Sequence, residues 1–135
     1  MNLADVKVIS LPKILDDRGN LSFFENGNQI PFNIGRAYWI YDVPGGEIRG
    51  GHAYHHLQET IIALSGSFDL VLNDGKETRK FTLNRSYNGI YVPRMIWRHM
   101  ENFSTNSLAL IVTDGPYDAN EYIRDYEQYQ QMQDA

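Results

Sequence analysis

Side chains that could do chemistry gather in one short stretch of the sequence, residues 46–59. It contains three of the four histidines, His52, His55 and His56, together with Arg49 and Glu59. A neutral imidazole can act as a general base or bind a metal ion near pH 7, and a carboxylate can do the same work. Apolar runs flank the stretch, and titratable groups between core strands are costly to bury unless they are paired. The stretch is therefore either a functional site or a loop whose histidines face water.

The elements that must position these residues are short runs of alternating apolar and polar residues. Such runs, separated by turn residues, are typical of β-strands. We expect strands at residues 6–11, 21–25, 36–43, 60–64, 68–72, 80–83, 89–93, 96–100 and 108–113. The turn at residues 16–20 predicts that the first two strands pair as a hairpin. The pattern predicts an all-β sandwich or barrel in a single domain, residues 1–135.

The end of the chain changes its period. Asp118 to Glu121 resembles a helix capping box. Tyr122, Tyr126 and Tyr129 follow at helical spacing. We therefore expect one short C-terminal helix, with this stripe of tyrosines used for packing.

Composition excludes several classes of function. The formal net charge of −5 gives no general attraction to nucleic acid or to an anionic membrane. There is no cysteine, hence no disulfide framework and no thiolate metal site. The first residues lack the apolar run of a signal peptide, and no stretch approaches the roughly 20 apolar residues of a membrane span. We expect a cytoplasmic protein.

The spacing of residues 46–66 resembles the first cupin motif, and residues 87–102 resemble the second. Gly46, Gly66, Pro93 and Asn102 stand in step with those motifs. The resemblance implies a cupin jelly-roll β-barrel that holds its ligand inside. Cupins bind a metal ion through His, His, Glu and His, whereas the corresponding positions here are His52, Tyr54, Glu59 and Arg98.

Arg98 changes what this barrel could hold. Arginine is a permanent cation with five donors and no acceptor, so it repels a divalent ion. Two remaining ligands are too few to hold a transition metal tightly. We therefore expect no metal in this barrel, and chemistry by acid–base groups.

Five segments in the same order resemble the WxcM-like cupin family of sugar 3,4-ketoisomerases. They are Asp17-Arg18-Gly19-Asn20-Leu21, Arg36-Ala37-Tyr38-Trp39-Ile40-Tyr41-Asp42, Arg49-Gly50-Gly51-His52-Ala53, Tyr91-Val92-Pro93 with Trp97, and Tyr122-Ile123-Arg124-Asp125-Tyr126. The resemblance implies that the substrate is dTDP-4-keto-6-deoxy-D-glucose, whose ketone moves from C4 to C3. It also implies a cytoplasmic, cofactor-free homodimer that serves the synthesis of 3-amino-3,6-dideoxy sugars for surface glycans.

The reaction itself suggests roles for three side chains. A proton must leave C3, an enediol or enediolate must form, and a proton must return at C4. His52 suits the base. Tyr54 follows two residues later and should share a strand face with His52, so its phenol could donate to O4 or relay a proton; Tyr38 could serve similarly. The family commonly has a second histidine at position 54, so the role of Tyr54 is open between relay and packing.

Six further residues are candidates for binding the substrate. A nucleoside diphosphate needs cations, and arginine binds phosphate oxygens bidentately. Arg98 could stabilise an enediolate or hold Glu59 in a structural ion pair. The candidate set is Arg18 and Arg49 for the phosphates, Arg36 for substrate binding or a structural role, Tyr91 and Trp97 for stacking on the base or core packing, and Arg98 inside the barrel.

Three other functions stay open at this point. A dTDP-sugar 3,5-epimerase-like enzyme also uses a His–Tyr pair in a cupin barrel. A degenerate cupin could bind a sugar nucleotide without turning it over. A metal-dependent cupin enzyme would require a metal ion despite Arg98.

Overall fold

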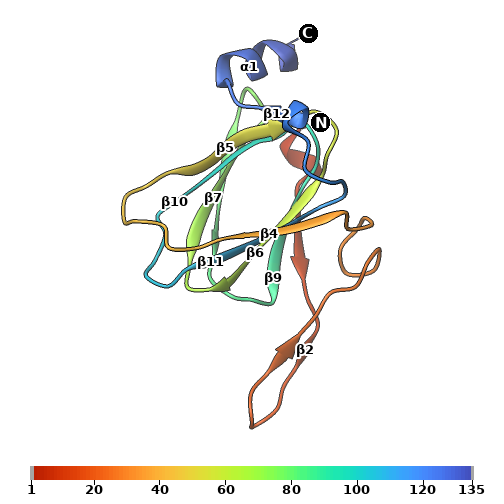
Figure 1. Ribbon diagram of the computed structural model, residues 1–135, viewed down its shortest axis with the longest axis vertical. Coiled ribbons are helices and arrows are strands. Elements are labelled where there is room, and N and C mark those ends of the chain that lie inside the picture. The colour runs from red at the N-terminus through yellow and green to blue at the C-terminus, as the bar shows by residue number, and fades with distance from the viewer. Residues whose placement is uncertain (1, 135) are drawn as a thin grey trace.

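The structure is a computed structural model that describes residues 2–134. Two five-stranded antiparallel sheets form the body of the protein. The first sheet has the order β1 (Lys7–Ser10), β9 (Asn88–Val92), β6 (Glu59–Ser65), β11 (Leu108–Thr113), β4 (Arg36–Ile40). The second has the order β12 (Tyr122–Ile123), β5 (Arg49–Tyr54), β10 (Trp97–Glu101), β7 (Phe68–Asn73), β8 (Thr78–Leu83). The sheets face each other as a flattened barrel (Figure 1). This confirms the cupin-type jelly roll.

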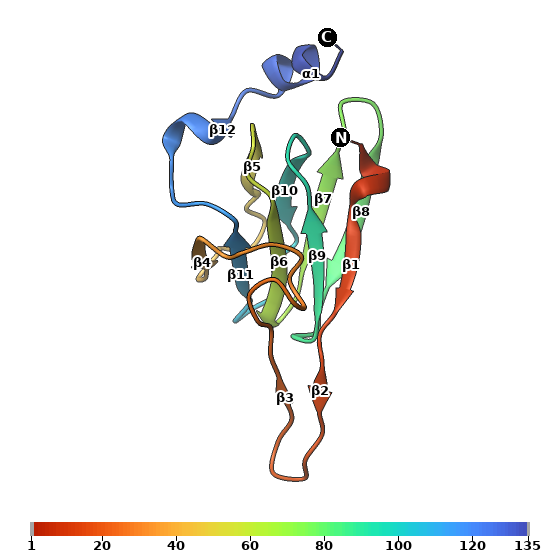
Figure 2. The same cartoon turned by 90° about the vertical axis from the view of Figure 1, so that its right-hand side faces the viewer.

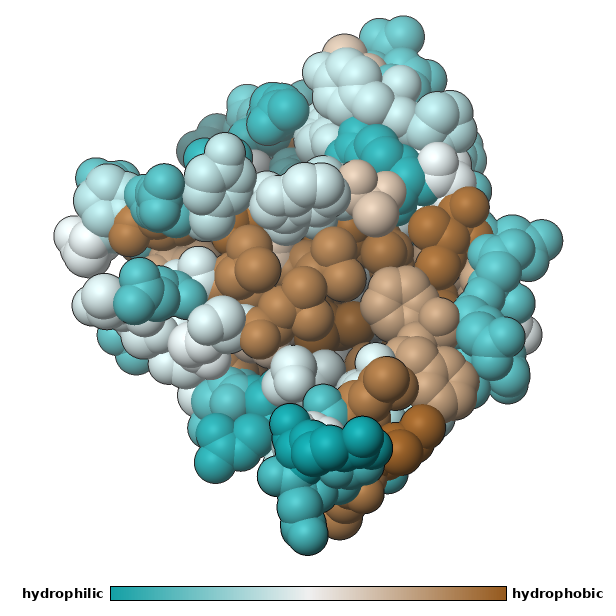
Figure 3. All heavy atoms as spheres, turned by 60° about the horizontal axis from the view of Figure 1, so that its bottom comes forward, coloured by the Kyte–Doolittle hydropathy of each residue, from teal (hydrophilic) through white to brown (hydrophobic). Residues whose placement is uncertain are grey.

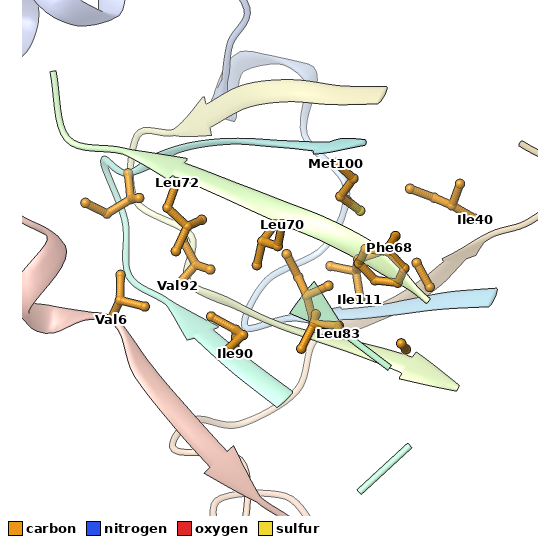
Figure 4. Close-up of a cluster of buried hydrophobic side chains, with 14 of the residues drawn as sticks. Val6, Ile40, Phe68, Leu70, Leu72, Leu83, Ile90, Val92, Met100 and Ile111 are labelled. Atoms are coloured by element: carbon orange, nitrogen blue, oxygen red, sulfur yellow. The ribbon is translucent and has the colours of Figure 1, made fainter. Parts of the chain in front are cut away.

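The hydrophobic core lies between the two sheets. Side chains alternate across each strand, so every second residue points inward. Those of Leu70, Leu72, Ile90, Val92 and Ile111 converge from both sheets (Figure 4) and are almost fully buried. The polar residues of the site point into the same interior from other strands. The interior of the barrel is therefore filled partly by the hydrophobic core and partly by the side chains of the site.

Both outer faces of the barrel are partly covered. The helix α1 (Tyr126–Asp134) packs over the second sheet, where Tyr129 joins Ala53 and Ile123 in a buried cluster. Residues 23–34 cross the first sheet, where Ile30 and Phe32 cover Val112. In Figure 2 the helix lies at one end of the molecule and a projecting hairpin at the other.

The projecting hairpin differs from the one expected from the sequence. Its strands are β2 (Lys13–Ile14) and β3 (Leu21–Ser22), which pair around the turn at residues 16–20. The preceding strand β1 instead pairs with β9. The prediction that residues 6–11 and 21–25 pair with each other was therefore wrong. Pro12 ends β1, so the next strand, β2, pairs with β3 in the hairpin and β1 joins the large sheet.

The C-terminal segment also departs from the expected helix. Asp118 caps only a short 3-10 turn, η2 (Ala119–Glu121), through a hydrogen bond from the Asn120 amide to its carboxylate. The chain then enters β12, and the α-helix begins only at Tyr126. The reason is tertiary: pairing with β5 holds Tyr122 and Ile123 in an extended conformation. Tyr122 thus lies on a strand and not on the predicted helix.

Candidate active site

A buried ion pair lies inside the barrel at the position where cupins hold a metal. Arg98 on β10 donates from Nε and Nη2 to the two carboxylate oxygens of Glu59 on β6, at 3.1 and 2.9 Å. Its Nη1 donates to the carbonyl of Gly50 at 2.8 Å, and Nη2 also donates to the Tyr38 hydroxyl at 2.9 Å. Burial acts to lower the pKa of Arg98, but the adjacent Glu59 charge more than offsets it, so the pKa is raised. The guanidinium is a permanent cation.

Four of the five Arg98 donor hydrogens are therefore committed to protein acceptors, and the side chain is fully buried. Of the two roles expected for it, this geometry supports the structural ion pair with Glu59. Through Nη2 the pair also anchors a chain of tyrosines.

Three phenols continue from Arg98 as one hydrogen-bonded chain. The Tyr38 hydroxyl lies 3.3 Å from that of Tyr54, and the Tyr54 hydroxyl donates to that of Tyr122, also at 3.3 Å. Arg36 closes the far end by donating from Nη2 to the Tyr122 hydroxyl at 2.9 Å. Burial first, and then the negative charge of Glu59, raises the pKa of Tyr54 well above its usual range. Tyr54 therefore stays protonated and can act as a donor.

His52 stands beside this chain on the inner face of β5. Its ring centroid lies 4.7 Å from that of Tyr54 and 4.7 Å from that of Tyr122. Only 4% of the residue is exposed, and its Nε2 is buried without a hydrogen-bond partner among residues 2–134. Burial, followed by the charges of Arg98, Arg124 and Arg36, lowers the pKa of His52 to about 2. The imidazole is neutral, and one nitrogen is unoccupied.

Strand register explains why these residues meet. Arg98 is paired with His52 across β10 and β5, and Tyr122 is paired with Tyr54 across β12 and β5. Directly opposed residues share a face of a sheet. Tyr38 and Arg36 lie two residues apart on β4 and also face the site, where the Arg36 guanidinium stacks 4.4 Å over the Tyr38 ring.

The structure brings His52, Tyr54, Tyr38, Arg36 and Arg98 together, but the other four candidates lie elsewhere. Arg49 is exposed at the start of β5. Trp97 lies on the outer face of β10, 5.3 Å from the Tyr126 ring and 5.7 Å from that of Tyr129 on α1. Tyr91 lies on the outer face of the first sheet, where it donates to Gln58.

Arg18 is the fourth candidate that lies apart. It sits at the tip of the projecting hairpin, where it pairs with Asp16 at 2.8 Å. The guanidinium holds the pKa of Asp16 down to about 2. With 89% of its side chain exposed, Arg18 makes no contact with the His52 site of its own chain.

Two residues of the site were missed by sequence reasoning. Tyr122 was assigned to a helical packing stripe, yet it contacts His52 and Tyr54. Arg124 stacks 4.5 Å over the Tyr122 ring and is one of the charges that act on His52. The one available signal was the segment Tyr122-Ile123-Arg124, whose alternation also fits a strand.

The remaining chemistry of the described chain is limited. Among residues 2–134 no group of three or more His, Cys, Asp or Glu side chains is placed to hold a metal ion. Within the same range, no helix is long and apolar enough to cross a membrane.

A jelly-roll barrel whose interior holds a buried imidazole, a chain of phenols and the Arg98–Glu59 pair is of the cupin type. Residues 4–134 match the family described as "WxcM-like, C-terminal" (FdtA). The chain belongs to this family.

Similar proteins agree with this assignment. The chain is 37% identical over 123 residues to the TDP-4-oxo-6-deoxy-alpha-D-glucose-3,4-oxoisomerase of Aneurinibacillus thermoaerophilus, covering 91% of this chain and 88% of that protein. A 3,4-ketoisomerase from Helicobacter canadensis superimposes with a TM-score of 0.94 at 38% identity, over 97% of this chain and 98% of the other. A variant 3,4-ketoisomerase from Thermoanaerobacterium thermosaccharolyticum, in complex with TDP-4-keto-6-deoxyglucose, gives 0.94 at 32%, over 96% and 94%.

Proposed function

We propose that this protein is a sugar-nucleotide 3,4-ketoisomerase that converts dTDP-4-keto-6-deoxy-D-glucose to its 3-keto isomer. The observation that carries the proposal is the unpartnered, buried Nε2 of His52 beside a chain of phenols. A buried polar atom without a partner is rare and calls for an explanation. A nitrogen that takes a proton from the substrate is such an explanation, and the activities named for the relatives support it.

His52 acts at carbon in this proposal. Its neutral ring takes the proton from C3, the C3–C4 double bond forms, and the same nitrogen returns the proton to C4. Burial first, and then the charges of the three arginines, lowers the pKa of His52, so the imidazole is a weak base in the absence of substrate. The negative charge of a bound diphosphate near Arg36 and Arg124 would offset part of that effect and raise the basicity of His52 when the substrate is present.

Tyr54 and Tyr38 act at oxygen. Their hydroxyls form part of one hydrogen-bonded chain, which supports a relay or donor role for Tyr54 over packing alone. Tyr54 keeps its proton because its pKa is raised, and it donates that proton to the Tyr122 hydroxyl, which favours the relay role over direct donation to O4.

Binding of the nucleotide is assigned to residues around the site. Arg36 lies at the site, and Arg49 begins the strand that carries His52. We retain both for the diphosphate because guanidinium groups bind phosphate oxygens bidentately. Stacking of the base on Tyr91 or Trp97 stays a prediction, and their outer-face positions give it no support from the site of the same chain.

The test is incubation of the purified protein with dTDP-4-keto-6-deoxy-D-glucose in deuterated buffer, followed by NMR. The 3-keto isomer should form, and it should carry deuterium at C4 in those turnovers in which the His52 imidazolium exchanges its proton with the buffer before returning it. His52→Asn should lower the rate by about 100-fold or more and keep the cooperative thermal transition. Absence of the 3-keto product would overturn the proposal, and an inverted ring centre would indicate an epimerase instead. Stabilisation by dTDP without turnover would indicate a binding protein.

We also propose a homodimer in which the projecting hairpin of one copy reaches the site of the other. A two-stranded hairpin is marginally stable alone, yet Ile14, Leu15 and Leu21 are all exposed on it. The outer face of the first sheet adds exposed Trp39 and Tyr41. The face turned forward in Figure 3 carries a broad hydrophobic area, of the kind that marks protein interfaces. Arg18 could then bind substrate in the partner's site.

Mixing two inactive variants tests this arrangement. In a mixed dimer of His52→Asn and Arg18→Ala chains, one of the two sites would combine an intact His52 with the partner's Arg18. Random exchange should therefore restore about a quarter of the wild-type sites. If subunit exchange is verified and activity does not recover, Arg18 lies outside the partner's site. A monomeric mass in light scattering would overturn the dimer.

A further inference from the structure

Tyr122 is the last phenol of the hydrogen-bonded chain, and like Tyr38 it is half-buried. Tyr38, Tyr54 and Tyr122 follow one another from the fully buried Arg98 toward the half-buried β12. Its ring lies beside His52, with centroids 4.7 Å apart, and 4.9 Å from Tyr54. Tyr122 therefore borders the base and the relay at once.

The donors and acceptors of the chain run in one direction. Arg98 can only donate, so the Tyr38 hydroxyl accepts from it and is free to donate to Tyr54. Tyr54 donates to Tyr122, and Arg36 donates to the same oxygen. The Tyr122 oxygen thus accepts two hydrogen bonds, while its own proton has no acceptor among residues 2–134. This proton is therefore the one proton of the phenol chain that is available to a bound substrate.

We propose that Tyr122 is a catalytic acid–base residue that moves the hydroxyl proton of the sugar from O3 to O4. The inference deepens the proposed ketoisomerase function and rests on it. His52 moves one hydrogen between carbons, and Tyr122 moves one hydrogen between oxygens.

The two steps balance. In the first, His52 takes the C3 proton, the C3–C4 double bond forms, the C4 carbonyl electron pair moves to O4, and O4 takes the proton of Tyr122. The result is a neutral enediol, an imidazolium and a phenolate. In the second, O3 returns its proton to Tyr122, the C3 carbonyl forms, and His52 returns its proton to C4. No oxidant or other reactant is consumed.

The surroundings of Tyr122 suit the intermediate charge. Arg36 and the Tyr54 hydroxyl donate to the oxygen that becomes negative, and charge-assisted hydrogen bonds are stronger than neutral ones. The Arg124 guanidinium lies 4.5 Å from the ring centroid. The imidazolium formed on His52 is adjacent and of opposite sign. These groups are in place before the reaction, which is how preorganised sites lower a barrier.

The position of Tyr122 is held by contacts outside the site. The Glu121 carboxylate accepts from the amides of His56 and Leu57, at 2.8 and 3.0 Å, and its second oxygen lies 2.8 Å from His56 Nδ1. This anchors the start of β12 beside the end of β5. A change of the Tyr122 hydroxyl alone therefore leaves the backbone contacts of its strand intact.

The experiment compares Tyr122→Phe with Tyr117→Phe. Both remove one hydroxyl, and the two rings lie 5.8 Å apart, but Tyr117 is exposed and its hydroxyl bonds to nothing within residues 2–134. Tyr122→Phe should lower kcat at least tenfold with KM within about twofold, as loss of a general acid does. Tyr117→Phe should keep the wild-type kcat.

Deuterium partitioning separates catalysis from packing. In Tyr122→Phe the C3 proton is removed more slowly, and the enolate that forms has no acid to protonate O4 and no base to take the O3 proton, so it returns to substrate more often than it goes on to product. Recovered substrate should therefore gain several-fold more deuterium per product formed than with the wild type. A kcat within threefold of the wild type, or a lowered kcat with an unchanged ratio, overturns the inference. A wild type without turnover overturns the proposed function and this inference with it.

A second replacement guards against a folding defect. If Tyr122→Phe loses its cooperative thermal transition, 3-fluorotyrosine at position 122 retains the hydroxyl and its hydrogen bonds but is more acidic. The basic limb of the kcat profile should then move to lower pH while KM holds. An unmoved limb overturns the role of Tyr122.

Discussion

Replacing His52 with Asn should remove a pH-dependent part of the stability of this protein. In the folded chain, burial and three arginines lower the pKa of His52 to about 2. In the unfolded chain a histidine has a pKa of about 6.5. Below pH 6.5 the unfolded state therefore takes up a proton that the folded state does not, and stability falls as the pH falls. His52→Asn cannot show this loss.

The magnitude follows from the pH interval and not from the depth of the shift. Each pH unit between the two pKa values changes the free energy of unfolding by about 1.4 kcal/mol. Between pH 7.5 and pH 5.0 the imidazole of the unfolded chain becomes almost fully protonated. Only the interval from its pKa of about 6.5 down to pH 5.0, about 1.5 pH units, contributes to the loss of stability. The wild type should therefore lose about 2 kcal/mol through His52 over this interval.

Urea unfolding at several pH values measures this quantity. The free energy of the variant is subtracted from that of the wild type at each pH, which cancels the titrating groups that both proteins share. His52→Leu serves as the control because it packs differently from Asn but also lacks an imidazole. Both differences should fall by about 2 kcal/mol between pH 7.5 and 5.0, whatever their absolute size. A difference that stays constant within about 0.5 kcal/mol would refute the neutral, buried His52 and weaken its role as base.

Two further predictions concern the contacts that hold the site. Glu59→Gln should destabilise the fold by about 3–5 kcal/mol in urea, because Arg98 is fully buried and would lose its counter-charge; the exposed pair Lys80–Glu101 is the control, and Lys80→Gln should cost less than about 1 kcal/mol. A Glu59→Gln cost below 1 kcal/mol would contradict the buried ion pair. Tyr129→Phe should cost about 1–3 kcal/mol by thermal or urea unfolding, because its hydroxyl bonds the carbonyls of Asn73 and Met95, at 3.0 and 2.8 Å; an unchanged transition would show that these bonds contribute nothing.

Much of the architecture could be read from local pattern. Alternation along a strand depends only on neighbouring residues, so the spacing of His52 and Tyr54 already places both on one face of β5. The position of Arg98 in the second motif likewise predicts a barrel that holds a cation of the protein where other cupins hold a metal. The cupin fold class followed from the motif spacings and the family from the resemblance of the five segments, and both are confirmed by the structure and its relatives.

The partners of these residues could not be read in the same way. Arg98 was open between two roles until the structure placed Glu59, 39 positions away in the sequence, against its Nε and Nη2. Trp97 and Tyr91 resembled stacking residues by type, but the faces of their strands turn them outward, toward α1 and Gln58. Burial and pairing across distant strands decide such contacts, and no local period encodes them.

Tyr122 shows most clearly which features follow from the sequence and which require the tertiary structure. Its spacing to Tyr126 and Tyr129 favours a helix, and its alternation with Ile123 and Arg124 favours a strand, so the sequence alone permits both. Pairing with β5 selects the strand and sets Tyr122 directly opposite Tyr54, 68 positions earlier in the chain. The sequence by itself determined which chemical groups this protein possesses and which of them share a strand face. Only the tertiary structure decided that a third phenol stands beside His52, because a short segment takes the conformation of the sheet edge that it pairs with.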